Sequence, residues 1–138
     1  MAVVLDVSVA VAWCVEDERS SVGEGLLRRV AMEGALVPSI WHLETANAIL
    51  IAVRRGRMRA GTQAAEMARL SALPIKIDRE TQSRAWSDTF DFAQRFSLTA
   101  YDASYLELAH RTRLPLASFD RKLCEAASAV GVHVVGNG

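Results

Sequence analysis

Residues 3–8 read Val-Val-Leu-Asp-Val-Ser. The first three, residues 3–5, are a short apolar run rich in β-branched side chains, and the run stops at Asp6. A short run of this kind, with no polar residue inside it, predicts a strand that is buried on both faces of a sheet. The apolar residues that follow predict a helix reaching Trp13. Asp6 is therefore expected at the carboxyl end of a buried strand, where side chains of parallel sheets form sites.

Further short apolar runs alternate with helical patterns along the 138-residue chain. The other predicted strands are residues 35–37, 75–77, 114–118 and 132–135. The predicted helices are one opened by Asp17 or Ser20 and closed by Gly34, one capped by Ser39 and closed by Gly56, and those over residues 61–73, 81–94, 99–111 and 120–130. Strands separated by helices predict right-handed crossovers and a mostly parallel sheet covered on both faces. We expect an α/β fold in one domain over residues 1–138.

The next predicted helix has Ser39 as its expected cap and closes at Gly56, and it is apolar on nearly all sides over residues 43–53. A helix that is apolar around its whole girth is expected to be buried. Glu44 is the only acid in this helix, so its carboxylate needs a partner or a shifted pKa. Asn47 follows one turn later on the same face and is expected to orient Glu44.

The composition is typical of a soluble globular protein and gives no electrostatic sign of nucleic-acid binding. Lys plus Arg and Asp plus Glu number 16 each, so the formal net charge is zero. Cys14 and Cys124 are the only cysteines and are expected to be buried free thiols. The sequence shows no signal peptide and no apolar stretch of about 20 residues. A cytoplasmic protein is expected.

Four acids from distant parts of the chain are expected at one edge of the sheet. Asp6 and Asp120 follow the first and fourth predicted strands directly. Glu44 lies in the second turn of one predicted helix and Asp102 in the first turn of another, and both helices begin at the carboxyl edge of the strands. Each of three acids has an alternative role, because Asp6 and Asp120 suit helix N-caps and Asp102 suits a capping box opened by Thr99.

Carboxylates gathered in one place repel each other unless a cation neutralises them. The sequence places no basic residue there, so a hard divalent cation with oxygen ligands, Mg²⁺ or Mn²⁺, is expected. Such an ion can activate water for attack on a phosphodiester. The three histidines, His42, His110 and His133, lack zinc-ligand spacing and are expected in surface or packing positions. Asp78 also ends a predicted strand, but it is expected in a solvated turn outside the site.

Four segments of the chain resemble PIN-domain ribonucleases of the VapC toxin type. They are Val-Leu-Asp-Val-Ser-Val-Ala at 4–10, Val-Pro-Ser-Ile-Trp-His-Leu-Glu-Thr-Ala-Asn at 37–47, Leu-Thr-Ala-Tyr-Asp-Ala-Ser-Tyr-Leu at 98–106 and Leu-Pro-Leu-Ala-Ser-Phe-Asp at 114–120. Their order and spacing agree with the family over residues 2–135. The resemblance implies a three-layer α/β/α sandwich and a Mg²⁺- or Mn²⁺-dependent endoribonuclease. It also implies a homodimer and inhibition by an antitoxin protein, as in toxin–antitoxin pairs.

The resemblance also assigns roles to individual residues. The implied catalytic and metal-binding acids are Asp6, Glu44, Asp102 and Asp120. The implied supporting residues are Ser8, Asn47 and Ser118. As a hypothesis, the first three acids hold one metal ion, and Asp120 completes the site or binds a second. Water activated by the metal would then cleave RNA to leave a 5′-phosphate and a 3′-hydroxyl.

One basic cluster and three tryptophans are not explained by the acids. The cluster consists of Arg54, Arg55, Arg57 and Arg59. These cations either complement a helix dipole or form a phosphate track beside the acidic pocket, with Arg54 and Arg55 as the candidates for RNA contact. Trp13, Trp41 and Trp86 lie in apolar helical patterns, so core or dimer packing is expected rather than base stacking.

Three other classes of protein compete with a nuclease. A haloacid-dehalogenase-like phosphatase needs a second Asp two residues after the first, where this chain has Ser8. A Rossmann-type nucleotide-binding module needs a glycine-rich turn after the first strand, and residues 6–9 contain no glycine. A catalytically silent PIN-like module that only binds RNA or protein remains an alternative, which metal titration can test.

Overall fold

The structure is a computed structural model, and it describes residues 1–136. Its centre is a five-stranded sheet in the order β3-β2-β1-β4-β5, in which each neighbouring pair is parallel. The strands are β1 (Val3–Leu5), β2 (Ala35–Val37), β3 (Ile75–Ile77), β4 (Leu116–Ala117) and β5 (Val134–Val135). The predicted α/β class with a parallel central sheet is confirmed.

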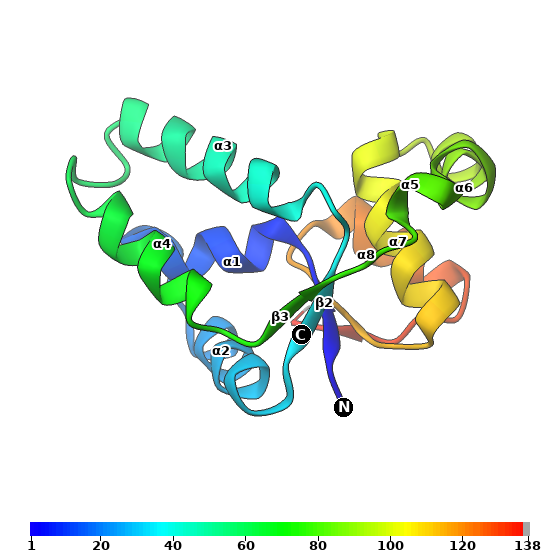
Figure 1. Cartoon of the computed structure of the whole chain (residues 1–138), viewed down its shortest axis with the longest axis horizontal. Helices are drawn as coiled ribbons and strands as arrows, with labels where there is room; N and C mark the ends of the chain where they lie inside the picture. Colours follow the sequence, from blue (N-terminus) through cyan, green and yellow to red (C-terminus); the bar gives the residue numbers. More distant parts are fainter. Residues whose placement is uncertain (137–138) are drawn as a thin grey trace.

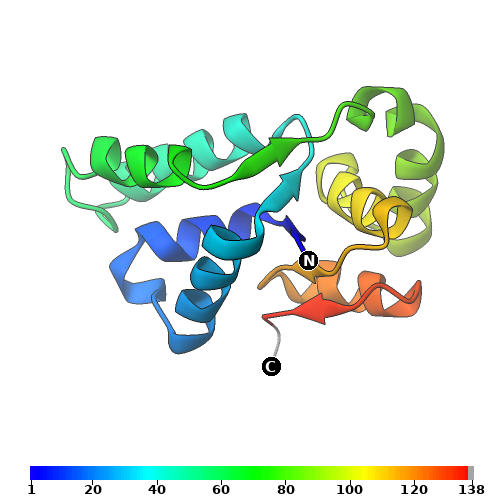
Figure 2. The same cartoon turned by 60° about the horizontal axis from the view of Figure 1, so that its bottom comes forward.

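Helices cover both faces of this sheet and complete a three-layer α/β/α arrangement (Figure 1, Figure 2). The first face carries α1 (Val7–Cys14), the short 3₁₀ helix η1 (Glu16–Glu18), α2 (Ser21–Glu33), α3 (Trp41–Arg54) and α4 (Gln63–Ser71). The second face carries α5 (Thr81–Arg84), the π-helical turn η2 (Ala85–Thr89), α6 (Phe90–Phe96), α7 (Ala100–Thr112) and α8 (Arg121–Ala129).

The strand order reverses between β1 and β4, and this reversal determines where a site can form. The chain runs outward from β1 through β2 to β3 and then crosses the sheet to β4 and β5. A crevice at the carboxyl ends of the strands forms at such a switch point. Val4 pairs with Leu116 and Leu5 with Ala117, so Asp6 and Ser118 emerge side by side from the two central strands.

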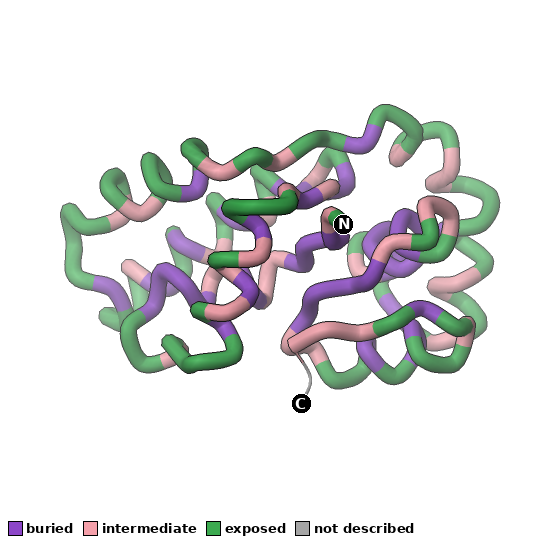
Figure 3. Tube along the Cα trace, turned by 90° about the horizontal axis from the view of Figure 1, so that it is seen from below, coloured by how far each residue is buried: buried purple, intermediate pink, exposed green. Residues whose placement is uncertain are grey.

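The hydrophobic core lies along the central strands and the inward faces of the helices that cover them (Figure 3). All three residues of β1 are fully buried, as expected of a strand covered on both faces. Cys14 and Cys124 are buried free thiols, as predicted. Among residues 1–136, no helix is both long and apolar enough to cross a membrane.

The local signals at several helix ends act as the sequence predicts. The Ser20 hydroxyl accepts the Gly23 N–H at 3.0 Å and caps α2. Gly34 ends the same helix with a φ of 85°, a conformation that favours glycine. Thr99 caps α7 by accepting the Asp102 N–H at 3.0 Å.

Helix α3 departs from the prediction at its start and on its outer surface. Ser39 does not cap it: α3 begins at Trp41, whose N–H donates to the Pro38 carbonyl at 3.0 Å. The helix is also not buried all round, because Leu43 is 78% exposed and Leu50 and Ile51 are exposed as well. Its buried residues are Trp41, Thr45, Ile49 and Ala52. They form one stripe, so the other faces of α3 remain open to solvent.

The second half of the chain contains three smaller departures. The helix predicted over residues 81–94 runs to residue 96 and includes the π-helical turn η2. Strands β4 and β5 are two residues each, shorter than predicted. Trp13 and Trp41 are buried as expected, but Trp86 in η2 is 96% exposed and does not belong to the core, so of its two predicted roles only dimer packing remains.

Candidate active site

Asp6 lies at the centre of the switch point and is 5% exposed. The hydroxyls of Ser8 and Ser118 both donate to its Oδ2, at 2.6 and 2.8 Å. Asp6 has the N-cap position of α1, but its carboxylate makes no capping hydrogen bond. The carboxylate is held instead by one hydroxyl from α1 and one from the segment after β4.

Backbone N–H groups determine which way those two hydroxyls point. The Phe119 N–H donates to Ser8 Oγ, and the Asp120 N–H donates to Ser118 Oγ, each at 3.0 Å. Because each serine oxygen accepts from the backbone, its own proton is free to point at Asp6. Ser8 and Ser118 thus connect the ends of β1 and β4 through the Asp6 carboxylate.

Glu44 is held by a residue that the sequence analysis did not single out. The hydroxyl of Tyr105, a buried residue of α7, donates to Glu44 Oε1 at 2.7 Å. Burial and this hydrogen bond raise the pKa of Tyr105, so its hydroxyl stays protonated and remains a donor. The sequence signal was its position three residues after Asp102, on the same face of a helix. Asn47 is exposed one turn beyond Glu44, and its role in orienting that acid stays a prediction.

Asp102 and Asp120 lie at the starts of α7 and α8, on the same edge of the sheet. Asp102 provides the N–H that Thr99 caps, which is half of the predicted capping box. Asp120 caps α8 by accepting the Leu123 N–H on Oδ1 at 3.1 Å. The capping alternative therefore holds for Asp120, and for Asp102 only the half of the capping box that Thr99 provides is present. Capping occupies one oxygen of Asp120 and leaves its second oxygen for another partner.

The four acids interact electrostatically although they come from four segments of the chain. Burial is the largest cause that raises the pKa values of Asp6, Glu44 and Asp102. Neighbouring acids add to it: Asp120 raises the pKa of Asp6, and Asp6 raises those of Glu44 and Asp102. Within the described chain, Lys122 is the one cation that lowers a pKa in this group, that of Asp102. The site is therefore acidic and poorly compensated.

We call the sheet edge that carries Asp6, Glu44, Asp102 and Asp120 the acidic edge. Its oxygen atoms are of the kind that a hard divalent cation binds, but they do not form a complete metal site. All four acids supply carboxylate oxygens, which Mg²⁺ and Mn²⁺ prefer. Among residues 1–136, however, no group of three or more His, Cys, Asp or Glu side chains is arranged to hold a metal ion. The fold brings the acids to one edge without closing them around an ion.

Asp78 is not in the solvated turn that was predicted for it. It is buried, and Arg111 of α7 lies 2.7 Å from its Oδ2. The Thr81 hydroxyl also donates to Asp78, at 2.9 Å. Burial raises the pKa of Asp78, but the hydrogen bonds from Arg111 and Thr81 outweigh burial and hold that pKa below its usual value. Asp78 therefore belongs to a separate ion-pair cluster and not to the acidic edge.

The basic cluster lies at the far end of α3 from Glu44. Ten residues separate Glu44 from Arg54 along the helix, a distance of about 15 Å at the usual helical rise. Arg57 pairs with Glu18 at 2.9 Å, so one of the four cations is already partnered. The cluster is thus not directly beside the acids, and RNA contact by Arg54 and Arg55 stays a prediction.

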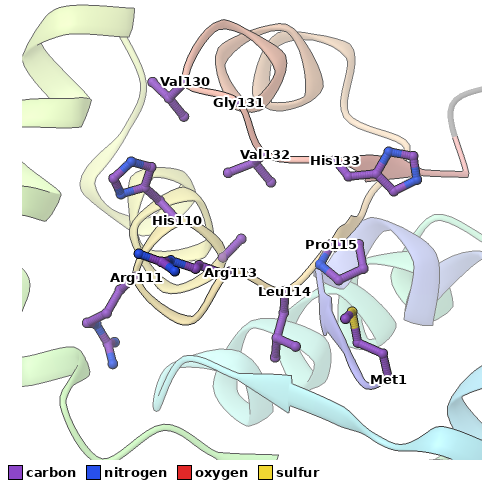
Figure 4. A pocket seen from close by; sticks show the side chains of 11 residues that line it. Met1, His110, Arg111, Arg113, Leu114, Pro115, Val130, Gly131, Val132 and His133 are labelled. Carbon is purple, nitrogen blue, oxygen red and sulfur yellow. The ribbon is translucent and has the colours of Figure 1, made fainter.

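A separate hollow of about 720 Å³ opens at the opposite edge of the sheet (Figure 4). Its lining includes Met1, Pro115 and Val132, which precede strands β1, β4 and β5. No Asp or Glu of the described chain lines it. His110 and His133 do, and all three histidines are exposed, in agreement with the prediction. This hollow is distinct from the acidic edge.

The fold and the acidic edge define the class of protein. The chain belongs to the PIN-domain family, which matches residues 3–129 under the description "PIN domain". Ribonuclease VapC3 of Pyrobaculum aerophilum is 27% identical over 130 residues, covering 94% of this chain and 98% of that protein. The crystal structure of PAE2754 from Pyrobaculum aerophilum matches with a TM-score of 0.69 and 23% identity. That match covers 98% of this chain and 92% of the other, and it supports the fold.

Proposed function

We propose that this protein is a metal-dependent endoribonuclease and the toxin of a toxin–antitoxin pair. The observation that carries the proposal is the coupling of Asp6, Glu44, Asp102 and Asp120 at the switch point of a PIN-domain sheet. RNA as the substrate is supported by the likeness to Ribonuclease VapC3. A homodimer and an antitoxin partner are proposed from the VapC resemblance.

The proposed cofactor is Mg²⁺ or Mn²⁺, held by Asp6, Glu44 and Asp102, with Asp120 completing the set. When bound, such a cation activates water and neutralises charge on the phosphate during cleavage. The protein's own groups position the ligands: Ser8 and Ser118 hold Asp6. Tyr105 holds Glu44 in the same way. Because such supporting hydrogen bonds fix the orientation of ligands, they tune metal affinity.

The test is RNA cleavage with and without divalent cations, paired with calorimetric titration of the protein with Mn²⁺. We expect cleavage in Mg²⁺ or Mn²⁺, none in excess EDTA, and recovery when Mn²⁺ is added beyond the EDTA. Saturable Mn²⁺ binding should accompany the activity. A protein that neither binds Mn²⁺ nor cleaves RNA would support the catalytically silent PIN-like module instead.

Replacing Tyr105 with Phe should weaken Mn²⁺ binding about ten- to hundredfold, as expected when an outer partner of a metal ligand is lost. The fold should lose only about 1 kcal/mol, the usual contribution of one hydrogen bond. Calorimetry measures the first effect and urea unfolding the second. Tyr101→Phe is the matched control, because Tyr101 is 63% exposed on the same helix and should change neither. Unchanged Mn²⁺ affinity in Tyr105→Phe would remove Tyr105 from the site.

A further inference from the structure

Strand β3 forms one border of the sheet and is paired only with β2 (Figure 2). The Ala35 N–H donates to the Pro74 carbonyl, and the Asp78 N–H donates to the Val37 carbonyl. Backbone groups alternate along a strand, so residues 74, 76 and 78 face β2 and Ile77 faces outward. Ile77 is 51% exposed. The free edge of β3 therefore presents the N–H and C=O of Ile77 and the C=O of Ile75.

A mainly apolar cavity of about 250 Å³ lies next to this edge. Residues of α3, α4, the segment before β3 and β3 itself line it: Trp41, Met67, Leu70, Leu73 and Ile75, together with the polar His42 and Ser71. Ile75 belongs both to the cavity and to the free edge, so the two are continuous. Alternate side chains of an added strand point to the same face of the sheet, so one of them can enter such a cavity.

A buried hydrogen-bond donor in this lining has no partner. Trp41 is 2% exposed, and its Nε1 finds no acceptor within residues 1–136. No other buried side-chain nitrogen or oxygen of the described residues lacks a partner. Buried donors are nearly always satisfied, so this unpartnered indole N–H is an exception within the described residues, and it belongs to a residue that lines the cavity.

Unpaired positive charge borders the same edge. Lys76 and Arg79 are both exposed, and within residues 1–136 neither forms an ion pair. Asp78 lies between them but is already bound by Arg111. Lys76 and Arg79 also line a second hollow along β3, together with Ile77 and Gln82. The free edge thus suits an occupant that carries negative charge.

We propose that the free edge of β3 binds an extended acidic segment of a partner protein, which adds as a sixth strand beside the five of the sheet. The segment's backbone pairs with Ile75 and Ile77, and one apolar side chain fills the adjacent cavity. The segment's acids face Lys76 and Arg79. This interaction is separate from the acidic edge and does not depend on nuclease activity.

A second copy of this chain fits the edge less well. Pairing two β3 strands brings together Lys76 of both copies and Arg79, which lies two residues beyond the strand, on one short stretch of edge. Like charges that face each other on neighbouring strands are destabilising. The charge therefore favours a different, acidic partner.

The test is a ¹⁵N NMR titration of the full chain with an acetylated and amidated peptide, Asp-Val-Glu-Val-Asp. A peptide with lysine at the three acidic positions is the matched control. We expect saturable shifts of the Ile77 amide and the Trp41 indole N–H with the acidic peptide, and at least tenfold weaker binding of the lysine peptide. Trp41→Phe identifies the indole resonance and should weaken binding severalfold.

Two further variants separate the backbone and charge contributions. Ile77→Pro removes the outward N–H without removing a bond to β2, so it should abolish binding while other resonances persist. Lys76→Glu with Arg79→Glu should reverse the preference between the two peptides, and it tests the charge even if Ile77→Pro fails to fold. No shift at millimolar acidic peptide, or equal shifts with both peptides, would overturn the proposal. The proposal would also be overturned if the chemical shifts of the β3 edge changed with protein concentration alone. The same holds if they changed on addition of a short RNA and not of the acidic peptide.

Discussion

Replacing Asp6 with Asn should abolish metal-dependent RNA cleavage and leave the metal-free protein at least as stable as the wild type at pH 7. The amide keeps the size of the carboxylate, and its oxygen can accept from Ser8 and Ser118, which now donate to Asp6. It removes the charge that the proposed cation requires. Loss of an outer partner of a metal ligand reduces activity up to about a hundredfold, so loss of a ligand itself should exceed that.

The stability part of this prediction follows from the direction of the pKa shift. Burial raises the pKa of Asp6, and the hydrogen bonds from Ser8 and Ser118 only partly oppose it. The folded carboxyl therefore holds its proton to a higher pH than the unfolded one. Above the ordinary carboxyl pKa of about 4 the folded state binds more protons, so the free energy of unfolding falls as pH rises through the folded pKa. An amide has no such dependence.

Urea unfolding at several pH values measures this effect. The two stability curves should agree near pH 4 and separate toward neutral pH, with Asp6→Asn the more stable. Adding Mn²⁺ should stabilise the wild type and not the variant. Asp17→Asn is the matched control, because Asp17 is exposed on η1 and should change neither activity nor stability. If Asp6→Asn cleaved RNA at the wild-type rate, Asp6 would be excluded from the chemistry. If the variant were less stable than the wild type, its loss of activity would be due to a damaged fold.

The first three strands could be predicted to the residue because their boundaries are local. Asp6 ends β1, and Gly34 and Pro38 bracket β2. The exposure of α3 could not be predicted, because an apolar pattern does not show how many neighbours a helix has. Only the stripe through Thr45 and Ile49 meets the core, and the rest of the apolar surface of α3 remains open.

The candidate site also has features that could be predicted from the sequence and features that could not. Acids at strand ends and helix starts can be placed on one edge from topology alone, and this located Asp6 and Glu44. Partners that meet only in the folded chain cannot be placed: Tyr105 is 61 residues from Glu44, and Arg111 is 33 residues from Asp78. The spacing of carboxylates around an ion depends on repulsion between side chains, which no sequence pattern records.

Replacing Arg111 with Met should destabilise the fold by about 3–5 kcal/mol, the usual effect of removing one partner from a buried ion pair. Arg111 contacts three acids: Glu107 in its own helix α7, and Asp78 and Glu80 in the segment after β3. Its nitrogens lie 2.7 Å from Asp78, 2.8 Å from Glu107 and 3.2 Å from Glu80. Asp78 and Glu107 are buried, so Met leaves two carboxylates without a counter-charge in a desolvated place.

The pH dependence and two further variants show whether the orphaned charges cause this loss. Asp78 has a lowered pKa in the fold, so its contribution to stability is present at neutral pH and is lost as pH falls through that value. The loss of unfolding free energy in Arg111→Met, measured by urea unfolding against the wild type, should therefore be largest near pH 7 and become smaller at acidic pH. Adding Asp78→Asn and Glu107→Gln should recover most of it, since no buried charge then remains. Arg121→Met breaks an ion pair whose arginine is 89% exposed and should lose no more than about 0.5 kcal/mol. An equal loss in both arginine variants would show that burial of Asp78 and Glu107 is not the cause.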